Sequence, residues 1–210
     1  MVQRTARTAR RKAPTKASGT VEVPEAAPRA ALPDFIPPEL ATLVDKAPDG
    51  DRSLHEIKFD GYRTAGHVRS GRVRMLTRKG LEWTVRFHPI ADALGGLKAL
   101  NAYLDGEIAV VGEDGVTSFA ELQAVLSDGP ASRLVYYAFD LLHLDRRDLM
   151  PLPLMQRKEA LQTLLAGLQE IGRIVDQAVG QPVGEHVPSQ SSPIVGTGRR
   201  AANAHCVAWR

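Results

Sequence analysis

The octet at residues 56–63, Glu-Ile-Lys-Phe-Asp-Gly-Tyr-Arg, constrains this chain more than any other feature of its sequence. Ile57 and Phe59 alternate with polar residues, which predicts a half-buried strand, and the Asp-Gly pair after them is a strong turn signal. Because side chains two residues apart share a face of a strand, Lys58 and Asp60 are predicted to point into one pocket. The octet therefore predicts a strand and turn that bring an amine and a carboxylate together.

Lys58 can act as a nucleophile only after losing a proton that a free lysine holds up to about pH 10.4. Lowering that pKa by roughly three units requires about 4 kcal/mol from burial and from nearby cations. In this interpretation Arg63 holds a phosphate or a ribose, and Asp60 orients the lysine. The alternative is a solvated lysine on an ordinary strand that is followed by a plain turn.

The apolar pattern predicts intermixed strands and helices without internal repeats. Ser70-Gly71 suits the turn of an antiparallel hairpin, and Ser118 with Glu121 forms a capping box at the start of a helix. The predicted strands are 62–68, 72–77 and 134–142, and the predicted helices are 85–100, 118–125 and 154–168. This mixture favours an α+β domain on an antiparallel sheet over a doubly wound parallel one.

The octet resembles the nucleotidyl-lysine motif, Lys-x-Asp-Gly-x-Arg, of the ATP-dependent DNA ligases and their capping-enzyme relatives. Residues 77–84, 104–108 and 137–142 resemble later motifs of that family, in the family's order. Residues 32–44 resemble the lead-in of the bacterial end-joining ligases, ligase D type. Each segment alone also fits an ordinary turn, hairpin end or apolar strand, so the order of the motifs carries the inference.

The resemblance implies a ligase that seals DNA breaks in repair and recombination through a lysyl-AMP intermediate, with ATP and Mg²⁺ as cofactors. Lys58 is the implied catalytic nucleophile, and Arg63 and Arg78 are the implied anion clamps. Phe139 is expected to stack on adenine. The full set of implied nucleotide-binding residues is Glu56 (at the adenine amino group), Lys58, Arg63, Arg78, Glu107 (at the ribose or as a metal ligand) and Phe139.

The resemblance also implies the fold, an antiparallel-sheet nucleotidyltransferase domain of the ATP-grasp-like DNA ligase adenylation type. We expect a basic disordered tail at 1–31, a partial adenylation domain at 32–168 and a disordered tail unlike the family at 169–210. The domain is expected to be incomplete and to lack the OB-fold barrel, because residues 172–210 contain no lysine and none of the family's later glutamate and lysine motifs. The hypothesis that this change of character suggests is a truncated or frame-shifted reading of a longer gene.

The charge distribution indicates the partners. The net charge is +3, but six basic residues precede the first acidic one, Glu22. Such a tail attracts nucleic acid through counterion release, although a solvated linker or a transit peptide is an alternative. We expect DNA nicks or double-strand ends as partners, end-joining repair proteins beside them, no membrane, and a cytoplasmic location. The single cysteine, Cys206, excludes an internal disulfide, and the scattered histidines receive no role.

Two other functions fit parts of the sequence. An RNA ligase or capping-type nucleotidyltransferase shares the lysine chemistry but has a different acceptor, and the ligase D-like segments argue against it. A non-catalytic DNA-binding remnant of a ligase fits the missing motifs, whereas the intact residues around Lys58 favour an enzyme. Retained DNA affinity without covalent nucleotide would identify the remnant.

Overall fold

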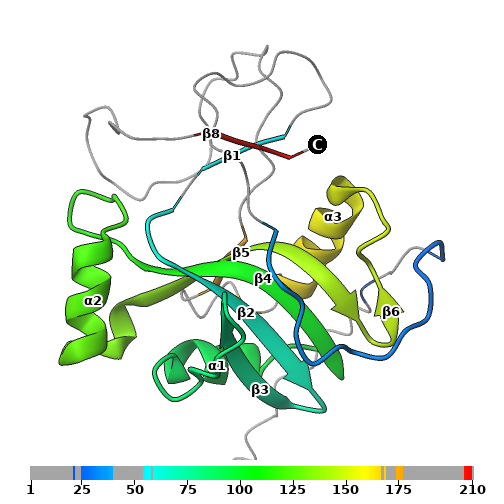
Figure 1. Ribbon diagram of the computed structural model, residues 1–210, viewed down its shortest axis with the longest axis horizontal. Helices are drawn as coiled ribbons and strands as arrows, with labels where there is room; N and C mark the ends of the chain where they lie inside the picture. Colours follow the sequence, from blue (N-terminus) through cyan, green and yellow to red (C-terminus); the bar gives the residue numbers. More distant parts are fainter. Residues whose placement is uncertain are drawn as a thin grey trace, which may run out of the picture.

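The computed structural model describes residues 21, 25–39, 54–57, 59–166, 168, 174–176 and 206–209. Its main feature is a six-stranded sheet with the strand order β3-β2-β4-β5-β6, in which β7 also pairs with β5 (Figure 1). The pairings are antiparallel except for β5 with β7. The strands are β2 (Tyr62–Arg69), β3 (Arg72–Thr77), β4 (Asn101–Val110), β5 (Leu134–Leu144), β6 (Arg147–Asp148) and β7 (Ile174–Asp176). The predicted α+β fold on an antiparallel sheet is confirmed.

The β2–β3 hairpin forms where the sequence predicts it. Arg69 pairs with Arg72, so two residues form the turn. Ser70 and Gly71 have φ values of 50° and 81°. Two successive positive φ angles match the twist of antiparallel strands, which is why such turns are favoured in hairpins.

A bulge interrupts the pairing of β4 with β5. Asp105 pairs with Asp140, and the next residue of β4, Gly106, pairs with Ala138. Phe139 is therefore the extra residue on β5. Bulges bend a strand and redirect its side chains, and they are common beside functional sites.

Among the described residues, three α-helices accompany the sheet: α1 (His88–Leu94), α2 (Phe119–Ser127) and α3 (Leu154–Leu165). The prediction of a helix over 85–100 is too long, because Pro89 occupies its first turn and Gly95 caps its end. Proline suits a helix start, and a glycine pair weakens continuation. The predicted cap of α2 is confirmed, since the Ser118 hydroxyl accepts a hydrogen bond from the Glu121 N–H.

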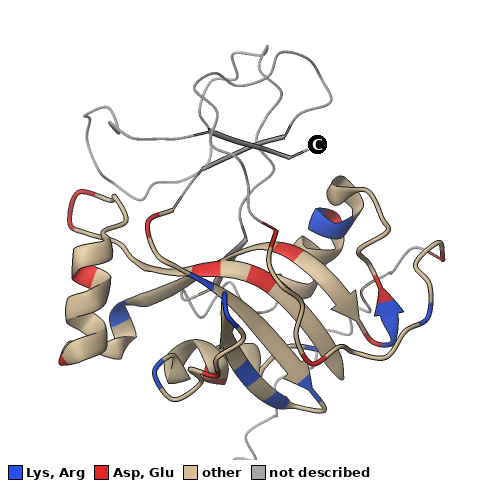
Figure 2. Cartoon of the chain, in the orientation of Figure 1, with Lys and Arg blue, Asp and Glu red and all other residues tan. Residues whose placement is uncertain are grey.

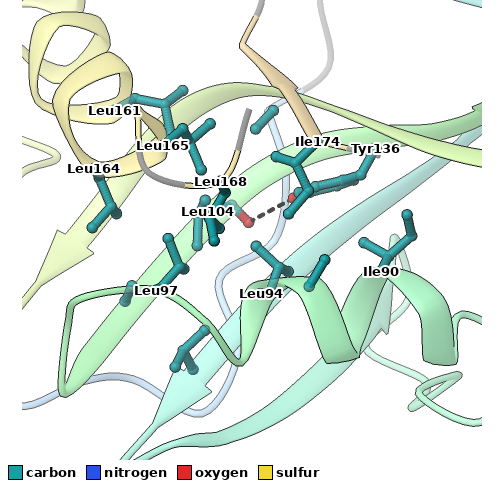
Figure 3. Packing of buried hydrophobic residues seen from close by; sticks show 14 of the residues in the cluster. Ile90, Leu94, Leu97, Leu104, Tyr136, Leu161, Leu164, Leu165, Leu168 and Ile174 are labelled. Carbon is teal, nitrogen blue, oxygen red and sulfur yellow. Dashed lines mark hydrogen bonds between the residues drawn. The ribbon is translucent and has the colours of Figure 1, made fainter. Parts of the chain in front are cut away.

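One hydrophobic core lies between the sheet and helices α1 and α3 (Figure 3). Gly66 makes room for it, because a Cβ there would lie 2.8 Å from the Leu94 side chain. Tyr136 is fully buried in this core, and its hydroxyl lies 3.0 Å from the Thr64 carbonyl oxygen and 3.3 Å from that of Leu104. Core members drawn in Figure 3 include Ile90, Leu94, Leu97, Leu104, Tyr136, Leu161, Leu164, Leu165, Leu168 and Ile174.

Residues 27–36 are called the N-terminal strap here. The strap begins at the β6 edge of the sheet, where Ala27 joins the main core and Arg29 forms a bridge with Arg147, and it continues over the opposite face. Leu32 and Ile36 pack against a small buried cluster that includes Tyr103. His67 and His143 each place Nε2 near a strap carbonyl oxygen, at 3.1 Å from Pro33 and 3.2 Å from Ala30.

The strap extends beyond the domain start that the sequence predicts. The sequence assigns residues up to 31 to a tail, whereas the structure places residues 27–31 on the sheet, where Ala27 is fully buried. The Arg147 guanidinium donates a hydrogen bond to the Ala27 carbonyl oxygen at 2.7 Å. Residues 27–31 are held by backbone hydrogen bonds and by contacts with residues far away in the chain. Such contacts do not produce a periodic pattern of apolar residues, so the sequence pattern does not reveal them.

Two strands lie in the region that the sequence assigns to a tail unlike the family. β7 adds Ile174 to the core, and β8 (Cys206–Trp209) pairs with β1 (Leu54–Ile57) in a separate two-stranded sheet. Strands of three or four residues are too short to show a period, so pattern alone does not identify them. The remaining residues of 169–210 lie outside the described part. No helix in that part is long and apolar enough to cross a membrane.

The Tyr136 hydroxyl tests the packing of this core. We expect Tyr136→Phe to lower the free energy of unfolding by about 1–2 kcal/mol, because it removes a buried hydroxyl that binds carbonyl oxygens of two strands. Urea unfolding measures the change. Tyr137→Phe is the matched control, since the Tyr137 hydroxyl makes no hydrogen bond among the described residues. Equal losses in the two variants would contradict the assigned role.

Candidate functional site

Arg63 and Asp105 form an ion pair at the centre of the site. Arg63 Nε and Nη2 donate to the two Asp105 carboxylate oxygens at 2.9 and 2.8 Å. The Asp105 side chain is 9% exposed and the Arg63 side chain 21%. Burial raises the pKa of Asp105, and the hydrogen bonds and charge of Arg63 oppose that rise. The two-pronged geometry fixes the direction of the guanidinium.

The Arg63 guanidinium also lies over the ring of Phe139, 4.3 Å from its centroid. A cation over an aromatic face is attracted by the ring's negative charge density. The ring belongs to the bulged residue of β5 and is 6% exposed. The bulge thus turns Phe139 toward the same face of the sheet as Arg63 and Asp105.

Glu107 lies beside Arg63 in the sheet. Arg63 on β2 pairs with Glu107 on β4, which pairs with Tyr137 on β5. The Tyr137 ring stacks on Phe59, with centroids 3.8 Å apart and an interplanar angle of 11°. Burial raises the pKa of the Tyr137 hydroxyl. Two aromatic rings and a carboxylate therefore border the ion pair.

Helix α3 supports the bulge from outside the site. The ammonium group of Lys158 is buried and donates to the Phe139 carbonyl oxygen at 2.9 Å. The guanidinium of Arg157 binds both carboxylate oxygens of Asp140 at 2.8 Å. The Lys158 contact gives the backbone carbonyl of the bulged residue a hydrogen-bond partner, and the Arg157 contact pairs the Asp140 carboxylate with a cation.

The Asp-Gly turn after Lys58 is held in place by two elements. The Asp60 N–H donates to the Thr117 hydroxyl at 2.9 Å, and its carboxylate accepts from the Phe119 N–H at 3.3 Å. Gly61 passes so close to β4 that a Cβ would lie 2.2 Å from the Ile108 carbonyl oxygen. Only glycine permits that approach, so the turn is held against β4 at residue 61.

The structure brings Arg63, Glu107 and Phe139 together, as the sequence predicts. Arg78 lies in the exposed turn after β3 and makes no described contact with those three. Glu56 is on β1, opposite Val207, and is described by its backbone. Lys58 lies outside the described residues, so its predicted role, like that of Glu56, stays a prediction. β1 ends at Ile57, so Asp60 belongs to the turn and not to the strand.

Sequence reasoning missed Asp105, Phe59 and Tyr137 as site residues. Asp105 lies two residues before Glu107 on β4, and Tyr137 lies two before Phe139 on β5. Because side chains two residues apart share a face of a strand, the prediction of Glu107 as a site residue could also have indicated Asp105. The ring contact between Phe59 and Tyr137 joins segments that are remote in sequence, so no local pattern reveals it.

Comparison with solved structures defines the class of fold. The chain resembles the ligase domain of LigD from M. tuberculosis with a TM-score of 0.51 and 29% identity, over 60% of this chain and 40% of that one. It resembles a mycobacterial DNA ligase D complexed with ATP and MES with a TM-score of 0.52 and 28% identity, over 62% and 42% of the two chains. The predicted DNA ligase nucleotidyltransferase fold is confirmed.

Sequence comparison gives the family. Residues 38–185 match the family described as ATP dependent DNA ligase domain, and the chain belongs to it. The multifunctional non-homologous end joining protein LigD of Pseudomonas aeruginosa is 39% identical over 139 residues. That alignment covers 66% of this chain and 16% of the relative, so the chain spans a small part of the curated protein.

The Arg63–Asp105 pair predicts a pH-dependent stability change. Arg63→Met leaves a buried carboxylate without its cation, and we expect the free energy of unfolding at pH 8 to fall by about 2–3 kcal/mol. The pKa of Asp105, already raised by burial, rises further in this variant. Stability is therefore retained at low pH, where the carboxyl is protonated in both states, and is lost as the pH rises through the folded-state pKa.

Urea unfolding of Arg63→Met at pH 5 and pH 8 measures this effect. The double variant Arg63→Met/Asp105→Asn is the matched control, because it removes both charges and should lose most of the pH dependence. If Arg63→Met lowers the free energy of unfolding equally at the two pH values, the loss does not come from an uncompensated Asp105 carboxylate.

Proposed function

We propose that this chain acts as an ATP-dependent DNA ligase, with Lys58 as the residue that carries AMP. The observation that supports this most is the meeting of Arg63, Glu107 and Phe139 on one sheet face, in a chain that belongs to the ligase family. The turn at Asp60-Gly61, which follows Lys58 in the sequence, is fixed to β4 and to the start of α2.

In the proposed first step, the deprotonated amine of Lys58 attacks the α-phosphorus of ATP. A nitrogen–phosphorus bond forms as the bond to pyrophosphate breaks, and the lysine proton leaves to solvent. Arg63 neutralises charge on the phosphate or holds the ribose, while Asp105 fixes its direction. Phosphoryl transfer depends mainly on such positioning and on charge neutralisation.

Two further transfers complete the proposed reaction. The 5′-phosphate of a DNA break attacks the lysyl-AMP, so that a phosphoanhydride forms and the nitrogen–phosphorus bond breaks. The 3′-hydroxyl then attacks the DNA phosphate, forms the phosphodiester and releases AMP. Arg78 lies in the exposed turn after β3. Its place in the family's motif makes it the proposed contact for the nucleotide and the 5′-phosphate. One relative is a non-homologous end joining protein. We therefore propose that the chain works in DNA repair by end joining, with other repair proteins as partners.

Glu107 is the proposed ligand for Mg²⁺, with the ribose as the alternative contact. No group of three His, Cys, Asp or Glu side chains in the described residues is arranged to hold a metal. Mg²⁺ commonly binds through only one or two carboxylates together with substrate phosphates. The residues present fit that mode, in which bound magnesium would neutralise charge on the phosphates. Phe139 and Glu56 are the proposed adenine contacts.

Covalent AMP is the test of this function. Incubated with ATP and magnesium, the chain should gain the mass of one AMP, and Lys58→Ala should gain none. Lys98→Ala removes an exposed lysine on the loop after α1 and is the matched control. Intact mass spectrometry measures all three. A folded chain without an adduct that still binds DNA would instead be the non-catalytic remnant.

Substitution of Glu107 separates its two proposed roles. We expect Glu107→Gln to slow adduct formation about tenfold or more, because a neutral amide is a weaker metal ligand than a carboxylate. Adduct formation is followed over a magnesium titration at fixed ATP. A rise in the magnesium concentration needed for half-maximal rate assigns Glu107 to the metal. A rise in the KM for ATP alone assigns it to the ribose, and an unchanged rate contradicts both roles.

A further inference from the structure

A cluster of arginines surrounds a pocket at the end of the β2–β3 hairpin, away from the residues considered above. The pocket has a volume of about 270 Å³ and is lined by His67, Arg69, Arg72, Arg74 and Glu82. We call it the arginine pocket. The hairpin register pairs Arg69 with Arg72 and His67 with Arg74, which places these side chains on one face. His67 contacts the strap, so that face is the one opposite α1.

The charges in the arginine pocket are incompletely balanced. Arg74 pairs with Glu82 at 2.8 Å, and Arg69 pairs with Asp34 at 3.0 Å. Arg72 is exposed and makes no ion pair with any described residue. Both pairs are partly exposed, with the Asp34 side chain 80% and the Glu82 side chain 41% accessible. Exposed pairs of this kind contribute about 0–1 kcal/mol each, so the guanidinium groups can exchange partners at little cost.

The cations continue along β3, which is the edge strand of the sheet. Arg72 and Arg74 lie toward the hairpin end, and Arg78 and Lys79 lie in the turn at the other end, both exposed. Figure 2 shows Lys and Arg along this strand and at the adjacent end of β2. Cations at successive positions along a line suit a polyanion better than a single phosphate ion.

We infer that the arginine pocket is a docking site for the phosphate backbone of duplex DNA at a distance from the break. This inference rests on the proposed function in one respect: it takes the end of β3 next to Arg78 as the end that faces the DNA break. Six residues of strand separate Arg78 from Arg72, or about 20 Å at roughly 3.3 Å per residue. Duplex DNA rises about 3.4 Å per base pair, so the pocket meets phosphates about six base pairs from the break. Guanidinium groups bind phosphates through two parallel hydrogen bonds.

Charged side chains on an edge strand have another use, because they prevent association of sheets edge to edge. This role needs no DNA, and the two explanations differ in what they predict for one arginine. Arg146 offers a matched comparison: it is also exposed, makes no ion pair with a described residue, and lies between β5 and β6 at the opposite edge of the sheet. Replacing either arginine by glutamine changes the net charge equally.

The test is binding of the full chain to a nicked duplex with long arms, measured by fluorescence anisotropy between about 50 and 200 mM salt. We expect Arg72→Gln to weaken binding about threefold to tenfold at low salt and to reduce the slope of log K against log salt by about 0.9, the loss of one phosphate contact. Arg146→Gln should match the wild type. Thermal melting confirms that each variant is folded.

The length of the duplex locates the contact. Shortening one arm below about six base pairs should abolish the difference between Arg72→Gln and wild type, while shortening the other arm should preserve it. Equal losses in Arg72→Gln and Arg146→Gln would overturn the proposal in favour of a general charge effect. No loss in Arg72→Gln would leave the arginines as edge protection. Stronger displacement of DNA by inorganic phosphate than by chloride, at equal ionic strength and only when Arg72 is present, would assign the pocket to a free phosphate ion.

Formation of the covalent AMP adduct is measured separately in the wild type and in Arg72→Gln. Arg72→Gln should form the AMP adduct at the wild-type rate, because the arginine pocket lies at the far end of the hairpin from Arg63. A wild-type chain that forms no adduct would overturn the proposed function and leave the DNA-binding comparison intact. A normal adduct with unchanged DNA binding in Arg72→Gln would overturn only the docking site.

Discussion

The pairing of β4 with β5 is the constraint on which the rest of the structure depends. Each strand contributes one face to the core and the other to the site, so any slip in register would exchange the two. The bulge at Phe139 is one of two points where the register of this pairing shifts. It leaves backbone groups to be satisfied elsewhere, and the buried ammonium of Lys158 on α3 satisfies one of them. A side chain of α3 therefore supports the backbone that carries the Phe139 ring.

The two faces of the sheet are built by different physical means. The face toward α1 and α3 is apolar, and it excludes water from Tyr136 and the leucines around it. The other face carries the Arg63–Asp105 pair at one end and the strap at the other. Burying a charged pair costs desolvation free energy, which is offset here by the two short hydrogen bonds and by the contact of Arg63 with Phe139. Such an arrangement holds the Arg63 guanidinium in one orientation.

The strap is held on this face by hydrogen bonds between its backbone and side chains of the sheet. Its carbonyl oxygens lie against His67 and His143, and Tyr103 exchanges hydrogen bonds with the backbone of Ile36. Burial, together with the charges of Arg69 and Arg74, lowers the pKa of His67, whose ring borders the arginine pocket. The strap and the arginine pocket thus share one histidine, and Arg69 contacts both through Leu32 and Asp34. The arginine pocket and the strap are therefore in contact with each other.

The sequence by itself determined the class of fold, the hairpin at Ser70-Gly71 and the Ser118 cap. It also predicted Arg63, Glu107 and Phe139 as site residues, and the structure places them near one another. Each of these follows from local signals: turn residues, a capping pair, two-residue alternation, and motifs in a familiar order. The tertiary structure decided the contacts that no local signal encodes. The strap, β7, the stacking of Phe59 on Tyr137 and the support of the bulge by Lys158 join segments far apart in the chain. Such contacts arise from complementary shape and unsatisfied backbone groups, and these exist only once the sheet has formed.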